Sequence, residues 1–388
     1  MATNNNDKTL NVPPLRFPEF SGEWEEHTLS EYLEFKNGLN PDAKRIGSGL
    51  PFISVMDILS EGVINYDNIR GKVNATEKEI ECFGVKDGDL LFQRSSETLE
   101  DVGRANVYMD NRTAIYGGFV IRGRKIGNYD PLFFKYLLAT PLARKRTCRM
   151  GAGAQHFNIG QEGLSKISLY FPSIEEQRKI AGFLSLIDER IATQNKIIED
   201  LKKLKSAIRK KIFSLLKDEY TKSFEINQLL DYEQPTAYIV ANDEYSTDTR
   251  LTPVLTANKG FILGYTDEKN GIYQKGACII FDDFTMDAKY VSFPFKVKSS
   301  AIKILTAKPN VNLRFMFEYL SYWELKSEEH KRHYISEISP LVIELPSKEK
   351  QNIIALLMTS LNNKLTIEEK AKIRYEVQKG YLLSQMFI

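Results

Sequence analysis

Some side chains in this sequence resemble catalytic or metal-binding groups, but each has a simpler explanation. Asp87 and Asp89 share a predicted β-turn, which accounts for both carboxylates without a metal ion. His330 and His333 lie one helical turn apart, but no further ligands are evident nearby. We therefore predict no metal site.

Signatures of nucleotide chemistry are also missing. The sequence contains no GxxxxGK[ST] phosphate loop, and residues 151–154 do not match GxGxxG. Residues 12–15 lack the amide or carboxylate that opens an adenine-methylation tetrapeptide. We predict no catalytic residue and no cofactor. By contrast, residues 93–98 mix hydrogen-bond donors and acceptors directly after a predicted strand, which suits recognition of a ligand through hydrogen bonds.

Composition limits the class of protein. The 388 residues are 42% apolar and include 22 Phe and 19 Tyr, enough to build two globular cores. The net charge is only +2, so any nucleic-acid contact must come from local patches. Three isolated cysteines fit a reducing cytoplasm, and neither a signal peptide nor a membrane-spanning run is evident.

A long helix is predicted from residue 173 onward. Ser173 is a good N-cap, and Glu176 lies three residues later, as in a capping box. Apolar residues then recur in steps of three and four, as a helix–helix seam requires. These seam residues are Ile180, Leu184, Ile187, Ile191, Ile198, Leu201 and Ile208, with Gln194 and Lys205 as polar positions.

The same pattern returns 174 residues later. Residues 346–351 repeat the Pro-Ser-x-Glu-x-Gln opening of residues 172–177. The second seam consists of Ile354, Met358, Leu361 and Leu365, with Glu368, Lys372 and Lys379 as polar positions. An internal repeat of this kind predicts two long helices that pair with each other within the chain.

The segments before the two helices also correspond. Each contains short predicted strands, among them residues 62–64, 90–92 and 116–122 in the first half, and a helix, 130–138 or 312–322. The loops differ almost completely. A shared frame with different loops indicates two modules that recognise different things.

At this point the sequence resembles the specificity subunits of type I restriction–modification systems. The resemblance rests on residues 14–25, Gly88-Asp89-Leu90-Leu91-Phe92, residues 102–105, and the opening of the first long helix. It covers essentially the whole chain. The second half departs from the pattern, because Lys350 replaces the usual Glu and no Gly-Arg follows Phe281.

The resemblance implies an α+β protein with two target-recognition domains held apart by an antiparallel coiled coil. The expected parts are a disordered tail (1–12), the first domain (13–172), the central helix (173–219), the second domain (220–346) and the last helix (347–388). It further implies that each domain reads one half of a split double-stranded DNA target. The helices would dock two methyltransferase subunits, and restriction subunits would join the full complex. S-adenosylmethionine, ATP and Mg²⁺ would belong to these partners.

Base contacts require side chains on loops in the major groove. In the first domain we predict Ser54, Met56, Asp57, Gln93, Arg94, Ser95, Ser96, Glu97, Thr98, Arg104, Gly153, Gln155 and His156. In the second domain we predict Thr256, Asn258, Lys259, Asp282, Asp283, Thr285, Met286, Lys331, Arg332 and His333. Arg144, Lys145, Arg146 and Arg149 would supply phosphate contacts. For each group, a solvated loop or helix face is the competing interpretation.

Three other functions stay open. The chain could be a coiled-coil scaffold whose globular domains bind proteins. It could be an enzyme with unrecognised nuclease or methyltransferase chemistry. Finally, its second domain could be degenerate, so that only one half-site is read.

Overall fold

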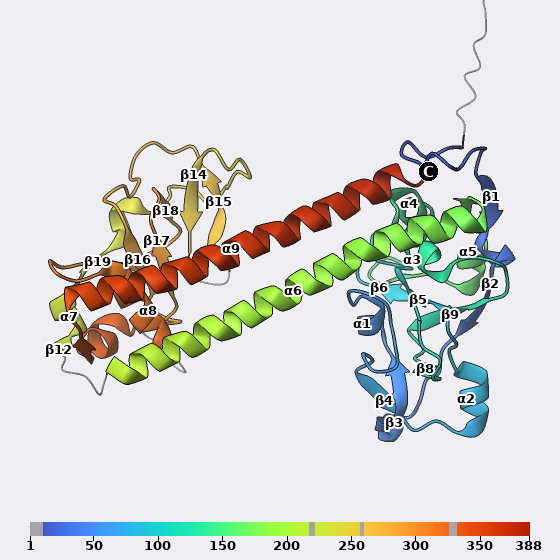
Figure 1. The fold of residues 1–388 in the computed structure, drawn as a ribbon, viewed down its shortest axis with the longest axis horizontal. Coiled ribbons are helices and arrows are strands. Elements are labelled where there is room, and N and C mark those ends of the chain that lie inside the picture. The colour runs from blue at the N-terminus through green and yellow to red at the C-terminus, as the bar shows by residue number, and fades with distance from the viewer. Residues whose placement is uncertain (1–10, 217–221, 257–259, 326–331) are drawn as a thin grey trace, which may run out of the picture. The chain divides into compact units, whose positions relative to one another are not determined.

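The computed structural model describes residues 11–216, 222–256, 260–325 and 332–388, and these form two compact units. The first unit contains residues 1–196 and 370–388, and the second contains residues 197–369. Each unit is a mixed α+β domain packed against one portion of two long helices, α6 (Ile174–Leu216) and α9 (Lys348–Gln385) (Figure 1). The predicted fold class is confirmed.

The domain of the first unit is built on two small sheets. One has the strand order β2-β9-β5-β7, and the other has the order β4-β3-β8. Two-stranded sheets β1-β11 and β6-β10 complete it. The strands are β1 Glu25–Thr28, β2 Leu33–Asn37, β3 Ile46–Ile53, β4 Gly71–Val73, β5 Leu90–Gln93, β6 Ser95–Ser96, β7 Ala105–Val107, β8 Ile115–Tyr116, β9 Val120–Lys125, β10 Phe157–Asn158 and β11 Ser168–Phe171. The helices are α1 Val55–Ile58, α2 Glu77–Phe83, α3 Pro131–Ala139, α4 Pro141–Cys148 and α5 Gln161–Ser165.

The second unit repeats this topology. Its four-stranded sheet has the order β13-β19-β16-β17, its three-stranded sheet has the order β15-β14-β18, and β12 pairs with β20. The strands are β12 Lys222–Glu225, β13 Leu230–Glu233, β14 Thr252–Leu255, β15 Ile262–Thr266, β16 Cys278–Asp282, β17 Ala288–Val291, β18 Lys296–Val297, β19 Ile302–Ala307 and β20 Val342–Leu345. The helices are α7 Ile226–Leu229 and α8 Leu313–Tyr322.

Two details of the first domain differ from the sequence prediction. Residues 62–64 form no strand and contribute only a bridge from Ile64 to Tyr108. Residues 116–122, predicted as one strand, are divided between β8 and β9 by a turn in which the Val120 amide donates to the Gly117 carbonyl. The two consecutive glycines, Gly117 and Gly118, account for the break, since glycine weakens a strand interior.

The long helices pair in opposite directions. In the first unit, the beginning of α6 shares a core with the end of α9, including Leu184 and Leu382. In the second unit, Phe213 near the end of α6 shares a core with Ile354 and Met358 at the start of α9. The predicted seam residues Ile180, Leu184, Ile187, Ile191, Ile198, Ile354, Met358 and Leu365 are buried, while Leu201, Ile208 and Leu361 are half-buried. Residues 217–219, which were predicted to extend the first helix, lie outside the described residues, as do residues 1–10 of the predicted tail.

The repeated opening motif attaches each domain to its helix in the same way. Gln177 donates to the Pro172 carbonyl (3.1 Å) and accepts from the Asp130 amide (3.1 Å). In the second unit Gln351 donates to Pro346 (2.9 Å) and accepts from the Asn312 amide (2.9 Å). Asp130 and Asn312 are the N-caps of α3 and α8. The buried Gln therefore joins the first turn of each long helix to the start of the domain helix packed on it.

The carboxylate three residues after the N-cap has a role that the capping-box prediction did not foresee. The Ser173 hydroxyl accepts from the Glu176 amide (3.3 Å). The Glu176 carboxylate, however, accepts two hydrogen bonds from Arg16 (2.8 and 2.7 Å). Next to this contact, the Leu15 amide donates to the Gln385 carbonyl (2.8 Å). The N-terminal segment therefore binds both long helices in the first unit.

Further along the helices, each unit has a polar joint between the helix pair and its domain. In the first joint, Asp188 of α6 contacts Lys379 of α9 (2.6 Å) and accepts from the Tyr136 hydroxyl of α3 (2.8 Å). In the second joint, Lys205 of α6 donates to Asn362 of α9 (2.5 Å). Asp188 and Asn362 are equivalent in the repeat, as are Lys205 and Lys379, because each pair is 174 residues apart.

The second joint obtains its carboxylate from the domain. Glu318 of α8 lies six residues after its N-cap, as Tyr136 does in α3, and is fully buried. It accepts two hydrogen bonds from Arg209 (3.0 and 2.6 Å) and lies 3.4 Å from Arg314. Burial lowers the pKa of Lys205 in this joint. A buried carboxylate of this kind is stable only with such partners.

Candidate nucleic-acid interface

The predicted contact residues after β5 form a small platform at the edge of the first domain. Ser95 and Ser96 make strand β6, which pairs with Phe157–Asn158. The Ser95 hydroxyl donates to the Asn158 side chain (2.5 Å). This pairing brings two predicted segments, residues 93–98 and 153–156, side by side. Glu97, Thr98, Gly153, Gln155 and His156 are exposed there.

Gly153 gives the platform its tight bend. Its φ is +143°, and a Cβ at this position would collide with the backbone carbonyl of His156. Such a turn lets a backbone approach a ligand closely, which only glycine allows. Arg104 lies half-exposed beside the platform and pairs with Asp101 (2.6 Å).

Two predicted side chains of the first domain face inward. Gln93 is 5% exposed, and its amide donates to the Ser95 carbonyl (2.9 Å). Asp57, also 5% exposed, accepts from the Ser54 amide and hydroxyl (both 2.7 Å) at the start of α1. Their burial argues against direct base contacts, because each satisfies a local turn. Met56, between Ser54 and Asp57, is 65% exposed.

Ser54 and Met56 line a groove together with the turn at Gly118 and Phe119, to which Arg94 is bonded. The Arg94 amide donates to the Phe119 carbonyl (2.9 Å), and its guanidinium donates to Gly118 (3.4 Å). The groove has a volume of ≈ 450 Å³ and includes Phe52, Met56 and Phe119 in its lining. Phe119 is 68% exposed, and sequence reasoning missed it because residues 116–122 were predicted as one strand. The Gly117-Gly118 pair was the signal of a turn.

The cationic run of α4 is divided between structure and surface. The Arg144 guanidinium donates to the carbonyls of Glu100 (2.8 Å) and Val102 (2.6 Å), and Arg146 pairs with Glu26 (2.7 Å). Burial lowers the pKa of Arg144. Lys145 and Arg149 are exposed and suit phosphate contacts better.

In the second domain, the acidic residues after the equivalent strand are structural. Asp282 accepts from the amides of Phe284 and Thr285 (both 2.9 Å). Asp283 accepts from the amides of His333 (3.1 Å) and Tyr334 (2.8 Å) and contacts Lys303 (3.3 Å).

Asp282, Asp283 and His333 are at most 5% exposed, so direct base contact by them does not fit this arrangement. His333 also contacts Glu337 (2.8 Å). The remaining predicted residues of this domain differ in exposure: Thr285 and Arg332 are exposed, and Thr256 and Met286 are half-buried. Asn258, Lys259 and Lys331 lie outside the described residues.

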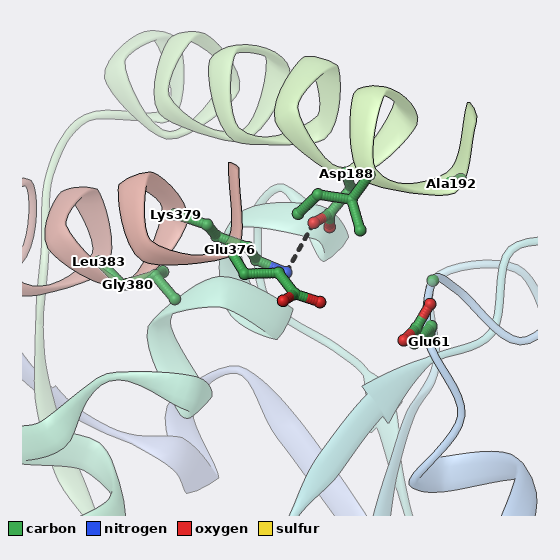
Figure 2. A pocket seen from close by; sticks show the side chains of 9 residues that line it. Glu61, Asp188, Ala192, Glu376, Lys379, Gly380 and Leu383 are labelled. Atoms are coloured by element: carbon green, nitrogen blue, oxygen red, sulfur yellow. Dashed lines mark ion pairs between the residues drawn. The ribbon is translucent and has the colours of Figure 1, made fainter. Parts of the chain in front are cut away.

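A second hollow of the first unit lies at the first joint. Figure 2 shows Asp188 of α6 facing Lys379 of α9, with Glu376 and the domain residue Glu61 beside them. The pocket measures ≈ 390 Å³. Lys135 lies next to it and donates to the Gly62 carbonyl; burial lowers the pKa of Lys135 to about 8. Mixed charges that neutralise one another suit a structural joint better than an anion site.

Two other kinds of site were sought within the described part of the chain. No cluster of three His, Cys, Asp or Glu side chains there could hold a metal ion. None of the helices in residues 11–216, 222–256, 260–325 and 332–388 is both long and apolar enough to cross a bilayer.

Comparison with known sequences gives the following matches. The family described as "Type I restriction modification DNA specificity domain" matches the chain twice, at residues 21–203 and 218–377. The type I restriction enzyme EcoR124I/EcoR124II specificity subunit of Escherichia coli is 39% identical over 178 residues, or 41% of this chain and 43% of that protein. The putative type I restriction enzyme MjaX specificity subunit of Methanocaldococcus jannaschii is 23% identical over 413 residues, or 97% of this chain and 96% of that protein. The chain therefore spans less than half of the first relative and nearly all of the second.

Solved structures share the fold. The crystal structure of the type I restriction–modification system S subunit from M. genitalium aligns with a TM-score of 0.63 at 16% identity, covering 97% of this chain and 99% of that chain. A structure described under complex assembly and conformational transition of the type I R-M system aligns with a TM-score of 0.55 at 12% identity, covering 96% and 99%. At these identities the likeness concerns the fold alone.

Proposed function

The chain belongs to the type I restriction–modification DNA specificity family, and from this premise we propose that it is the DNA sequence-recognition subunit of a type I complex. Its double-stranded target is bipartite, with one half read by each domain. The domains correspond to residues 13–172 and 220–346, and the remaining parts are a tail (1–12) and two helical segments (173–219 and 347–388). The competing scaffold interpretation is not favoured by these relationships.

One observation carries this proposal. Gln177 and Gln351 attach the two domains to the helices through the same pair of hydrogen bonds. The loops that follow β5 and β16 differ in sequence. The two domains are therefore attached to the helices in the same way but carry different loops. Because an α-helix rises 1.5 Å per residue, 43 residues such as those of α6 correspond to roughly 65 Å of helix, compared with about 34–36 Å for one turn of B-DNA. We propose that this helix pair fixes the spacing of the half-sites.

The same helices present apolar side chains that are exposed in the described part of the chain. In α9 the first unit exposes Ile373, Val377 and Tyr381, spaced four residues apart, and the second unit exposes Ile353 and Leu356. Apolar rows of this kind mark protein interfaces. We propose that two methyltransferase subunits dock there, and that restriction subunits join the full complex.

Catalysis belongs to those partners in this proposal. The modification subunits bring S-adenosylmethionine, the restriction subunits bring ATP and Mg²⁺, and this chain supplies neither a cofactor site nor a catalytic residue. Turnover by the purified chain alone would contradict this division. We place the complex in the cytoplasm, where its three free cysteines stay reduced.

The decisive experiment is genome-wide mapping of methylated adenine in cells that carry this chain with a cognate methyltransferase. It is repeated after residues 224–346 are exchanged for those of another family member. A split motif in which the exchange alters only one half supports two independent readers. If methylation is absent or unchanged in both strains, the second domain does not read DNA, and a scaffold whose complex lacks salt-dependent DNA affinity becomes the better description.

A further inference from the structure

The groove beside Arg94 is a rigid feature of the first domain. The ends of β2, β3 and β8 converge there, because the Leu39 amide donates to Tyr116 (2.9 Å) and the Gly117 amide donates to Ile53 (3.0 Å). Phe119 occupies the third position of the turn between β8 and β9. Its carbonyl accepts from the Arg94 amide, so its backbone is fixed while its ring projects into solvent.

The lining of the groove is mostly apolar and carries no charge. None of the thirteen residues that line it is charged. Three of them are large apolar side chains that are exposed to solvent: Ile46 is 54% exposed, Met56 is 65% exposed and Phe119 is 68% exposed. Asn40, also exposed, adds an amide to the lining. Exposed apolar groups grouped in this way indicate a ligand with an apolar part.

Two cationic side chains and one acidic side chain, the exposed Asp42, lie near the groove. Arg94 hydrogen-bonds to the groove turn, and the exposed Lys44 precedes Ile46 by two residues. In the major groove of DNA, thymine is the base that presents an apolar methyl group, and it does so beside the O4 acceptor. A mostly apolar groove with an amide in its lining and cations nearby suits the methyl group and the O4 atom of a thymine.

The second unit shows that the aromatic ring is not part of the shared skeleton. There the Asp283 amide donates to the Ala301 carbonyl (2.9 Å), as the Arg94 amide does to Phe119. The equivalent positions are therefore Arg94 and Asp283, and Phe119 and Ala301. A half-buried cation and an exposed ring in the first domain correspond to a buried acid and a methyl group in the second. The pair of Arg94 and Phe119 is therefore specific to the first domain.

We propose that Phe119, together with Met56 and Ile46, contacts the 5-methyl group of a thymine in the half-site read by the first domain. The inference rests on the proposed function and adds one base class to it. Phe119 acts as a specificity residue that touches the DNA, and Asn40 supplies an amide close to O4.

The test uses the chain assembled with its modification subunits and a duplex carrying the mapped target. Each thymine of the first half-site is replaced in turn by uracil, which lacks only the methyl group, and the Kd is measured at one fixed salt concentration. We expect one replacement to weaken binding about three- to fivefold, as the loss of one buried methyl contact implies. The Phe119→Ser complex should bind the native duplex more weakly by a similar factor and should no longer distinguish thymine from uracil.

Phe293→Ser is the matched control, because Phe293 is an exposed ring (39%) of the second unit. It should keep the full uracil effect in the first half-site. Unchanged unfolding temperatures of both variants would show that the fold is intact, as expected for exposed side chains.

Two results would overturn the inference while leaving the proposed function standing. One is a split target whose first half tolerates uracil everywhere or contains no thymine. The other is a Phe119→Ser chain that binds DNA normally or that fails to assemble with its modification subunits, which would make the groove a protein contact. Loss of sequence-specific binding by the native complex would instead remove the proposed function itself.

Discussion

The two joints use the same pair of positions on the long helices but place the negative charge differently. In the first joint the carboxylate, Asp188, belongs to α6, and the domain contributes the neutral Tyr136. In the second joint the helix position holds Asn362, and the domain contributes Glu318. Asp188 is 21% exposed, whereas Glu318 is fully buried. The repeat therefore preserves a polar connection between three helices without preserving which residue carries the charge.

This difference predicts that the second joint is the more costly one to break. Replacing Glu318 with Ala leaves the Arg209 guanidinium, whose side chain is only 16% exposed, without its carboxylate. Breaking a buried pair from one side costs about 3–5 kcal/mol. We expect a loss of this order in the free energy of unfolding, measured by urea denaturation.

Glu369→Ala is the control for this prediction, since Glu369 (48% exposed) pairs with Lys202 (60% exposed) at the surface. An exposed pair of this kind contributes at most about 1 kcal/mol. Equal losses for the two variants would mean that burial of Glu318 does not matter, and the distinction between the joints would collapse.

Asp188→Asn gives the first joint the helix residue of the second. Tyr136 can still donate to the amide oxygen, but Lys379, 28% exposed, loses its counter-charge. Because this pair is partly screened by solvent, we expect a loss of about 1 kcal/mol in unfolding free energy. The exposed Glu199→Gln, which removes a surface pair with Lys203, serves as the reference. A loss as large as that of Glu318→Ala would show that the two joints are energetically alike.

The smallest expected effect is a pH dependence confined to the first joint. Burial lowers the pKa of Lys135 from 10.5 to about 8, against the opposing influence of Asp188. Between pH 8 and 10.5 the unfolded chain therefore binds more protons at this residue than the folded chain does. Lys135 consequently makes the protein more stable as pH rises through that window.

Lys135→Met removes this titration. The difference in unfolding free energy between variant and native protein should shrink as pH rises from 8 to 10, with the variant relatively more stable at the lower end. A difference that stays constant across this range would contradict the lowered pKa. Lys145→Met makes the same change of side chain at an exposed position and serves as the reference.

The two long helices could be predicted from the sequence because apolar residues recur along each of them at spacings of three and four. Ile180, Leu184 and Ile187 are buried as their spacing requires. The polar seam positions Lys205 and Lys379 were also identifiable, since they interrupt that spacing. The domain residues that complete the joints, Glu318 and Tyr136, were not identifiable, because they come from domain helices whose docking no local pattern encodes.

The recognition surface was less predictable because loop residues serve two purposes. Polar residues such as Asp57 and Asp283 look like base readers, yet their carboxylates satisfy backbone amides of nearby turns. The reverse error occurred at Phe119, an apolar residue assigned to a strand that a two-glycine turn interrupts. Hydrogen-bonding capacity in a sequence does not reveal whether the partner is the chain itself or a ligand.

The packing of Phe387, just after α9, against the first domain also determines the order in which the protein can be completed during synthesis. The Phe387 ring packs against Trp24 and Phe133, with ring centres 6.1 and 5.4 Å apart. All of the second unit lies between these partners in the sequence. Although its domain is translated first, the first unit cannot close its core until residues 382–387 have been synthesised. A product that lacks Phe387 would therefore have an incomplete core in the first domain, around Trp24, at the opposite end of the sequence.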